Sequence, residues 1–227
     1  MPDGRTYVAR VPTCSPVGSA ECADVLAKPR TVIFFLHGAG GLEDPATSAY
    51  WLGAFHAIAP DAILVYGISK DGSRRWDAGV CCTTAPVDDV GYLAEVVDDL
   101  AASWSIARAR VGALGVSNGG MLALRATCER PDLVTAVAAL SATYDGACDR
   151  GKVRVAQWHG ALDTVVPLDG GAVPLYGAVR NFPPVASIAK RMTAGSVFVV
   201  SILPGRSHAM TWAEYRPAML WLLGVLR

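Results

Sequence analysis

The sequence has little charge and no long uninterrupted apolar run. Charged residues make up 18% of its 227 residues, and 20 acidic residues balance 20 basic ones, so the formal net charge is zero. The basic residues are scattered, and the densest cluster is the pair Arg74 and Arg75. This distribution lacks the basic patch by which proteins bind nucleic acids or anionic membranes. No apolar run approaches the roughly 20 residues that span a bilayer as a helix. We therefore expect no nucleic-acid partner and no membrane partner.

Motifs for metals and nucleotides are also missing. The cysteines form no Cys-x-x-Cys pair and no recognisable zinc pattern. No P-loop sequence occurs, and the glycine-rich segment 38–43 lacks the third glycine of a dinucleotide-binding loop. The expectation is a protein without a metal and without an organic cofactor.

Six cysteines in a chain of this size favour disulfides, with buried thiols as the alternative. The candidate pairs are Cys14 with Cys22, which flank a short loop, and Cys128 with Cys148, which flank a predicted strand. The adjacent Cys81 and Cys82 are harder to place, and six cysteines allow about fifteen pairings. Disulfides form in oxidising compartments, which predicts secretion. The first residues have no apolar signal-peptide core, so a mature or trimmed chain is expected.

Apolar, β-branched runs alternate with helical patterns along the chain. With 52% hydrophobic residues, residues 1–227 are expected to form one α/β domain. The alternation predicts a mostly parallel central sheet with helices on both faces. The predicted strands are 31–36, 62–66, 110–116, 134–140, 153–158 and 197–203, with 7–11 as an added edge strand.

Helices are predicted between these strands. Apolar residues recur at helical spacing over 88–104, and a second helix is predicted over 118–128. A final helix has Pro217 in its first turn and ends near Leu226. The segment 170–194 carries two weak helical patterns around two prolines, which predicts a kinked excursion too short for a substantial cap. An active site at the strand ends would then be open, which favours bulky or polymeric substrates.

The most informative motif is Gly115-Val116-Ser117-Asn118-Gly119, which reads G-x-S-x-G. It follows a predicted strand and precedes a predicted helix, the context of a sharp turn that lifts a serine oxygen above a sheet edge. Glycines two residues before and after the serine allow the strained backbone and the close packing that a Cβ would block. We therefore predict that Ser117 is a nucleophile.

A serine nucleophile needs a general base, usually a histidine oriented by a buried carboxylate. In the α/β-hydrolase arrangement these groups follow the chain order Ser, acid, His. Of the four histidines, only His208 comes after both the nucleophile and a later strand-end acid. Asp163 closely follows the strand 153–158 and precedes an apolar stretch, so we predict it as the acid, with Asp169 as its competitor.

The tetrahedral intermediate of acyl transfer also needs two donors for its oxyanion. One is expected to be the backbone N–H of Asn118, directly after the nucleophile. The other is predicted at Ala39, with Gly40 as the alternative, because this Gly-rich loop follows an early strand and can approach a substrate carbonyl closely. His37 is then expected to support that loop rather than to act as a second base.

Six segments carry a resemblance to a known family. They are Leu36-His37-Gly38-Ala39-Gly40-Gly41, Arg75-Trp76-Asp77-Ala78-Gly79-Val80-Cys81-Cys82, Val87-Asp88-Asp89-Val90-Gly91-Tyr92-Leu93, Gly115-Val116-Ser117-Asn118-Gly119-Gly120-Met121, Trp158-His159-Gly160-Ala161-Leu162-Asp163 and Ser207-His208. Together they resemble the polyhydroxybutyrate depolymerase-like esterases, the branch of α/β hydrolases that also contains feruloyl and acetyl xylan esterases. The resemblance covers nearly the whole chain.

This resemblance implies the α/β-hydrolase fold with a minimal cap, the Ser117, Asp163 and His208 triad, and a secreted enzyme. It also implies that the loop around Trp76 and Cys82 lies close to the active site and that Cys128 and Cys148 form a bridge. Trp76 and Trp212 are the candidates for stacking on a substrate. The chain departs from the family after His208, because Trp212 comes two positions later than the family pattern has it.

The resulting prediction is a serine carboxylic ester hydrolase that acts through an acyl-enzyme. Its expected partner is an ester substrate, either a polyester of the hydroxyalkanoate kind or a feruloyl or acetyl ester of a carbohydrate. Two alternatives remain. One is a serine peptidase on the same fold, and the other is a non-catalytic binding protein that kept the fold.

Overall fold

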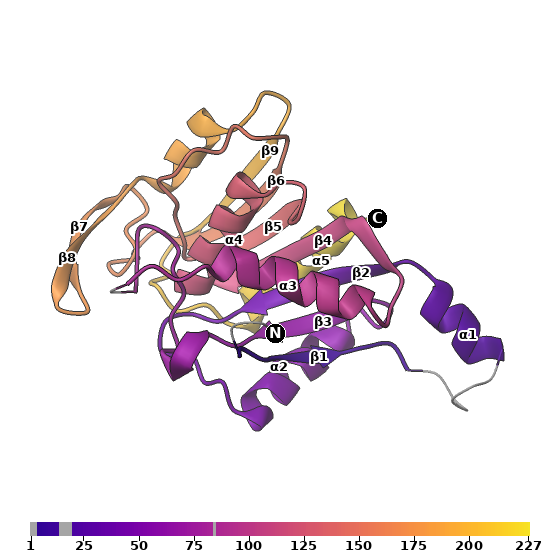
Figure 1. Cartoon of the computed structure of the whole chain (residues 1–227). Helices are drawn as coiled ribbons and strands as arrows, with labels where there is room; N and C mark the ends of the chain where they lie inside the picture. The colour runs from indigo at the N-terminus through magenta and orange to yellow at the C-terminus, as the bar shows by residue number, and fades with distance from the viewer. Residues whose placement is uncertain (1–3, 14–19, 84) are drawn as a thin grey trace.

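The computed structural model describes residues 4–13, 20–83 and 85–227, which build a seven-stranded sheet with helices on both faces (Figure 1). The strand order is β1-β3-β2-β4-β5-β6-β9, and all neighbours are parallel except β1, which pairs antiparallel with β3 at one edge. The strands of this sheet are β1 (Tyr7–Arg10), β2 (Arg30–Leu36), β3 (Ile63–Gly67), β4 (Ile106–Val116), β5 (Ala136–Leu140), β6 (Arg154–Gly160) and β9 (Val197–Leu203).

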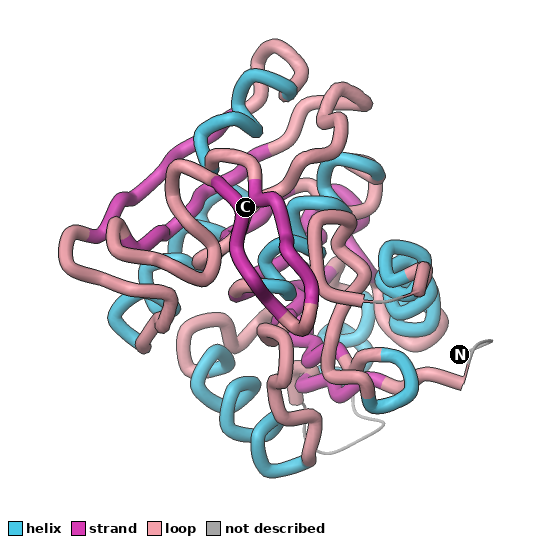
Figure 2. The backbone as a smooth tube through the Cα atoms, turned by 90° about the vertical axis from the view of Figure 1, so that its left-hand side faces the viewer, coloured by secondary structure: helices cyan, strands magenta, loops and turns pink. Residues whose placement is uncertain are grey.

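The described chain has five α-helices. They are α1 (Ala20–Ala27), α2 (Pro45–His56), α3 (Asp89–Ala101), α4 (Asn118–Glu129) and α5 (Trp212–Val225), with the short 3-10 helices η1 (Lys70–Gly72) and η2 (Val185–Arg191). Of the five, α2 to α5 pack against the sheet. The buried residues of α3 and α4 join one core cluster, and those of α2 and α5 join another. A separate hairpin of β7 (Gly171–Leu175) and β8 (Ala178–Phe182) projects from the body and faces the viewer in Figure 2.

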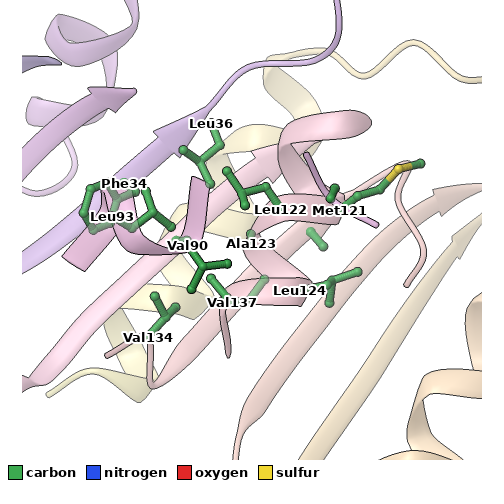
Figure 3. Close-up of a cluster of buried hydrophobic side chains, with 14 of the residues drawn as sticks. Phe34, Leu36, Val90, Leu93, Met121, Leu122, Ala123, Leu124, Val134 and Val137 are labelled. Atoms are coloured by element: carbon green, nitrogen blue, oxygen red, sulfur yellow. The ribbon is translucent and has the colours of Figure 1, made fainter. Parts of the chain in front are cut away.

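The central strands supply side chains to both cores. On β2, Phe34 belongs to the core with α3 and α4, whereas Phe35 belongs to the core with α2 and α5. Successive side chains of a strand point to opposite faces, so a strand buried on both sides reads as a continuous apolar run. Figure 3 shows Phe34 in the first core with Leu93 of α3 and Leu122 of α4.

Most of the elements predicted from the sequence are confirmed. All seven predicted strands are present, with bounds that differ by a few residues, and the helices over 88–104 and 118–128 correspond to α3 and α4. Helices α1 and α2 were not predicted from the sequence. For α2 a signal was available, because Asp44 accepts a hydrogen bond from the Thr47 N–H and Pro45 opens the helix.

The prediction of helical patterns in 170–194 is wrong for most of that segment. It folds into the β7–β8 hairpin, followed by η2. Tyr176 and Gly177 between the two strands both have positive φ, 52° and 76°, which matches the two-residue hairpin turn whose twist suits the flanking strands. The turn residues therefore outweigh the weak helical periodicity.

The position of Pro217 also differs from the prediction. Helix α5 begins at Trp212, so Pro217 lies inside the helix rather than in its first turn. The start is set by Thr211, whose side chain accepts from the Ala213 N–H, while the Glu214 side chain accepts from the Thr211 N–H. This reciprocal capping box fixes the helix start five residues before the proline.

Two disulfides tie the described chain together. Cys128 at the end of α4 is bonded to Cys148, which confirms that predicted pair, and Cys81 is bonded to its neighbour Cys82. Cys14 lies outside the described residues, so its pairing with Cys22 stays a prediction. Within the described segments, no helix has both the length and the apolar character needed to cross a bilayer.

Replacing both Cys128 and Cys148 by alanine should lower the free energy of unfolding by about 3 kcal/mol. Their bridge joins residues 20 positions apart and so restricts the unfolded chain. The matched control replaces Cys81 and Cys82 by alanine. That bridge joins adjacent residues and restricts almost no chain, so its loss should lower the free energy much less. Denaturant unfolding of both variants measures the difference, and equal losses would contradict the explanation.

Candidate active site

Ser117 lies in the sharp turn between β4 and α4 and has a backbone conformation that is rare for a residue with a side chain. Its φ is 52° and its ψ is −123°. The turn also brings backbones very close together. A Cβ on Gly115 would collide with the Gly119 carbonyl, and a Cβ on Gly119 would collide with the Leu36 carbonyl of β2. These contacts explain why both positions carry glycine.

The structure brings the three predicted residues of the triad together from three strand ends. Ser117 follows β4, Asp163 follows β6 and His208 follows β9. His208 Nε2 lies 2.9 Å from Ser117 Oγ, and His208 Nδ1 lies 2.8 Å from Asp163 Oδ2. The backbone of His208 is also held, because its carbonyl accepts a hydrogen bond of 2.8 Å from the Ser141 hydroxyl. The competitor Asp169 is exposed and makes no such contact.

The carboxylate of Asp163 is buried, and both of its oxygens accept hydrogen bonds. Its Oδ1 accepts hydrogen bonds from the N–H groups of Val165 and Val166 at 2.9 and 2.8 Å, and its Oδ2 accepts one from His208 Nδ1. Burial disfavours the charged carboxylate, but the hydrogen bonds from His208 and from the backbone outweigh it and hold the pKa of Asp163 below its usual value. This carboxyl group is therefore ionised at neutral pH.

A second histidine, His159, lies beside the same carboxylate without sharing its role. Its Nε2 is 2.8 Å from the Val166 carbonyl and 3.4 Å from Asp163 Oδ2. The side chain is fully buried, and this burial lowers the pKa of His159. A neutral His159 thus donates to the backbone and holds the loop that carries Asp163.

The loop after β2 places Ala39 at the cleft. The Gly40 N–H donates to the Arg74 carbonyl at 2.8 Å, so the alternative oxyanion donor is already engaged. Within the described ranges, no hydrogen bond is recorded for the backbone N–H of Ala39 or of Asn118. His37 supports this loop, as expected. Its ring is buried, and Nε2 lies 2.8 Å from Glu43 while Nδ1 lies 2.8 Å from the Gly38 carbonyl.

The side chain of Asn118 connects the turn of Ser117 to the segment 76–82, a role that sequence reasoning missed. Its Oδ1 accepts from the Trp76 N–H at 2.7 Å. Its Nδ2 donates to the carbonyls of Trp76 and Cys81 at 2.9 and 3.2 Å. Asn118 is fully buried, so it satisfies three backbone groups that have no access to water.

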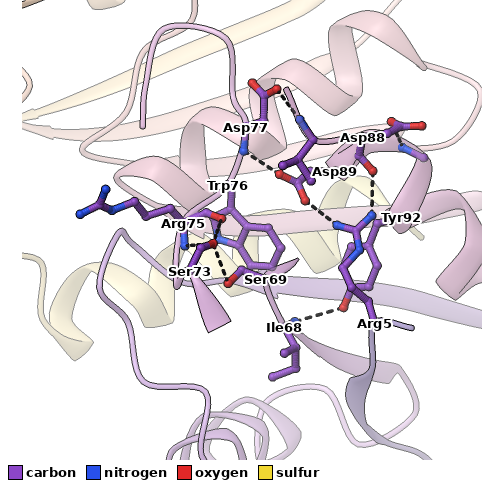
Figure 4. Close-up of polar contacts among 12 residues, drawn as sticks. Arg5, Ile68, Ser69, Ser73, Arg75, Trp76, Asp77, Asp88, Asp89 and Tyr92 are labelled. Atoms are coloured by element: carbon purple, nitrogen blue, oxygen red, sulfur yellow. Dashed lines mark hydrogen bonds and ion pairs between the residues drawn. The ribbon is translucent and has the colours of Figure 1, made fainter. Parts of the chain in front are cut away.

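Two carboxylates hold the other side of the same segment (Figure 4). Asp89 accepts from the Asp77 N–H at 2.6 Å and forms an ion pair of 2.5 Å with Arg5. Asp77 in turn accepts from the Val87 N–H at 3.0 Å and pairs with Arg125 at 3.1 Å. This network confirms that the segment around Trp76 and its neighbours is fixed next to the nucleophile.

The two tryptophans predicted to contact substrate do not line the cleft. Trp76 is fully buried, and its indole N–H donates to the His37 carbonyl at 2.9 Å, so it is a packing residue. The ring of Trp212 packs on Phe55, with 5.6 Å between ring centroids. Trp76 is therefore corrected to a structural residue, whereas Trp212 is 39% exposed outside the cleft and its contact with substrate stays a prediction.

A cleft of about 280 Å³ opens in front of Ser117 and His208. Its walls are mainly apolar: Met121 and Met210, Val165 and Val166, the adjacent cysteines, and Leu175 and Tyr176 of the hairpin. Apart from His208, no lining side chain is ionisable near neutral pH, which suits an uncharged, apolar group next to the nucleophile. No group of three or more metal-ligating side chains occurs among the described residues.

The chain is similar to named esterases in sequence and in fold. No family model matches the chain. The chain is 30% identical over 155 residues to NocK of Nocardia uniformis subsp. tsuyamanensis, a protein whose name gives its esterase activity as unproven. This match covers 65% of the chain and 44% of NocK. The chain is 28% identical over 185 residues to feruloyl esterase C of Emericella nidulans, covering 79% of this chain and 62% of the relative. The chain thus spans less than two thirds of either relative.

Among solved structures, esterase PE8 superposes with a TM-score of 0.65 at 18% identity, covering 97% of this chain and 99% of that one. This likeness confirms the α/β-hydrolase fold. The resemblance to feruloyl esterases is also confirmed, by the curated relative.

Asp163→Asn should lower kcat for a simple ester by about 10³- to 10⁴-fold, because the amide holds His208 in the wrong tautomer. Asp169→Asn is the matched control and should leave kcat nearly unchanged, since Asp169 is exposed. Steady-state hydrolysis of p-nitrophenyl butyrate by both variants measures the effect. A loss confined to the Asp169 variant would overturn the assignment.

Asn118→Ala should lower both stability and activity. The Trp76 N–H would be left buried without a partner, which destabilises the protein by about 1–3 kcal/mol, while the carbonyls of Trp76 and Cys81 keep the backbone N–H donors of Cys82 and Ala78. The segment 76–82 should also lose its position beside Ser117, so kcat/KM for the same ester should fall. Denaturant unfolding and steady-state kinetics measure the two effects, and unchanged stability would show that the three hydrogen bonds contribute nothing.

Proposed function

We propose that this chain, which has the α/β-hydrolase fold and is similar to feruloyl esterases, is a serine carboxylic ester hydrolase. The observation that supports this most directly is the continuous set of hydrogen bonds from Asp163 through His208 to Ser117. It has the order and the distances that an activated serine requires. The mainly apolar cleft in front of Ser117 supplies room for the acyl or alcohol part of an ester.

The reaction proceeds through an acyl-enzyme. His208 Nε2 takes the proton of the Ser117 hydroxyl as the Oγ attacks the ester carbonyl, and Asp163 stabilises the imidazolium. The N–H groups of Ala39 and Asn118 bind the oxyanion. When the tetrahedral intermediate collapses, His208 gives its proton to the leaving alcohol. Water then attacks the acyl-enzyme with His208 as base, which releases the acid and restores the serine.

The relatives and the cleft support a proposal for the substrate class. A feruloyl esterase among the relatives favours a feruloyl or acetyl ester of a carbohydrate, and the sequence resemblance adds a hydroxyalkanoate polyester. A cleft of about 280 Å³ fits a small acyl group, while its open side leaves room for a larger alcohol. The two disulfides in the described chain support secretion, because such bonds persist in oxidising compartments.

The test compares p-nitrophenyl butyrate hydrolysis by the wild-type protein and its Ser117→Ala variant. The variant should lose kcat by a factor on the order of 10⁶, to the background rate, and should no longer be labelled by a fluorophosphonate. Ser103→Ala, at an exposed position, is the control and should behave as wild type. Wild-type protein that neither hydrolyses the ester nor takes the label would show a non-catalytic protein on this fold.

A further inference from the structure

We infer that a second cavity, next to the cleft of Ser117, binds an anionic group carried by the ester substrate. This inference rests on the proposed function. The chemical class is an ester with a carboxylate or a similar oxyanion a few bonds from the ester carbonyl. The anion is carried by either the acid half or the alcohol half.

The second cavity has a volume of about 480 Å³ and shares a wall with the cleft. Its polar lining comes from Lys70, Ser73, Arg75 and Thr83, and Cys82 lines both the cavity and the cleft. The bridge between Cys81 and Cys82 therefore lies between the two spaces. A substrate that passes this bridge would have its ester at Ser117 and its far end near two cations and the Thr83 hydroxyl, since the Ser73 hydroxyl already donates to the Arg75 carbonyl.

Arg75 lines the second cavity and contacts a residue that lines the cleft. Its guanidinium lies over the ring of Tyr176, 4.1 Å from the ring centroid, and Tyr176 at the tip of the hairpin lines the cleft. Stacking on an aromatic face restrains the planar guanidinium and leaves its N–H groups at the edge available to an acceptor. The hairpin thus positions a cation at the border between the cleft and the second cavity.

Within the described residues, no acidic side chain neutralises the positive charge of Arg75. Among the side chains that the structure describes, no carboxylate forms an ion pair with Arg75 or with Lys70. The nearby carboxylates Asp77 and Asp89 are each paired with another arginine. Figure 4 shows the Arg75 side chain extending away from that network.

This arrangement differs from that of an ordinary surface arginine. The guanidinium is restrained by a ring, borders a cavity and lies next to a catalytic cleft whose own lining is apolar. A carboxylate can accept two parallel hydrogen bonds from such a group. The site would therefore favour an anionic ester over a neutral one of the same shape.

Two matched substrate pairs test the inference and show whether the acid half or the alcohol half of the ester carries the anion. For the acid half, 4-nitrophenyl hydrogen adipate is compared with 4-nitrophenyl hexanoate. For the alcohol half, 4-carboxyphenyl butyrate is compared with 4-carbamoylphenyl butyrate. Arg75→Gln should lower kcat/KM for the anionic member of at least one pair by about 10- to 100-fold, the usual contribution of a hydrogen bond to a charged group. The neutral members should change less than about twofold.

Three further variants separate recognition from general electrostatics. Arg74→Gln removes the same charge from the exposed neighbouring position and should leave the anionic preference intact. Arg75→Lys should keep part of it. Tyr176→Phe should keep the preference because only the ring is required, and Tyr176→Ala should reduce it.

A binding measurement keeps the inference testable apart from catalysis. Calorimetric titration of Ser117→Ala with 4-carboxyphenyl butyrate and hydrogen adipate monoamide measures affinity without turnover, and Arg75→Gln in that background should weaken at least one of the two. If Arg75→Gln changes neither kinetics nor affinity while the wild-type protein still hydrolyses p-nitrophenyl butyrate, the anion site is wrong and the esterase stands. If Ser117→Ala retains hydrolysis, the proposed function is wrong, and the titration alone decides on the anion site.

Discussion

The backbone turn at Ser117 is the constraint on which the rest of the site depends. Its positive φ is held because glycines on both sides let α4 approach β2 and β4 more closely than any side chain would allow. β4 is paired on both sides, with β2 and β5, so the turn cannot relax by moving its strand. The strain is therefore maintained by two buried elements, β4 and α4, and the hydroxyl stays above the sheet edge.

The parallel sheet then decides which loops can reach that hydroxyl. The carboxyl ends of parallel strands lie at one edge of the sheet. Loops after β2, β6 and β9 consequently deliver Ala39, Asp163 and His208 to the serine that follows β4. Asp163 is fixed by backbone N–H groups of its own loop, and His208 by the hydroxyl of Ser141, which follows β5. Asp163 is thus held by its own loop, whereas His208 is held by a neighbour from a different strand end.

The segment between β3 and α3 shapes the substrate side. Apart from the short η1, its described residues form no helix or strand, and side-chain hydrogen bonds and ion pairs hold it in position. Asn118 holds it from the nucleophile side and Asp89 from the α3 side, with the Cys81–Cys82 bridge at the cleft wall. These contacts place Arg75 against Tyr176 of the hairpin. The same segment therefore joins the catalytic turn to the second cavity.

The sequence alone determined the order and nature of the strands, the turn at Ser117 and the choice of His208, because these rest on local periodicity, glycine spacing and chain order. It also indicated Asp163, although Asp169 stayed open until hydrogen bonding separated a buried carboxylate from an exposed one. The direction of the Trp76 and Trp212 rings, the hairpin, the pairing of adjacent cysteines and the position of Arg75 were decided only by the tertiary structure. Each of these depends on which distant segment packs against the residue, and no local pattern records that contact.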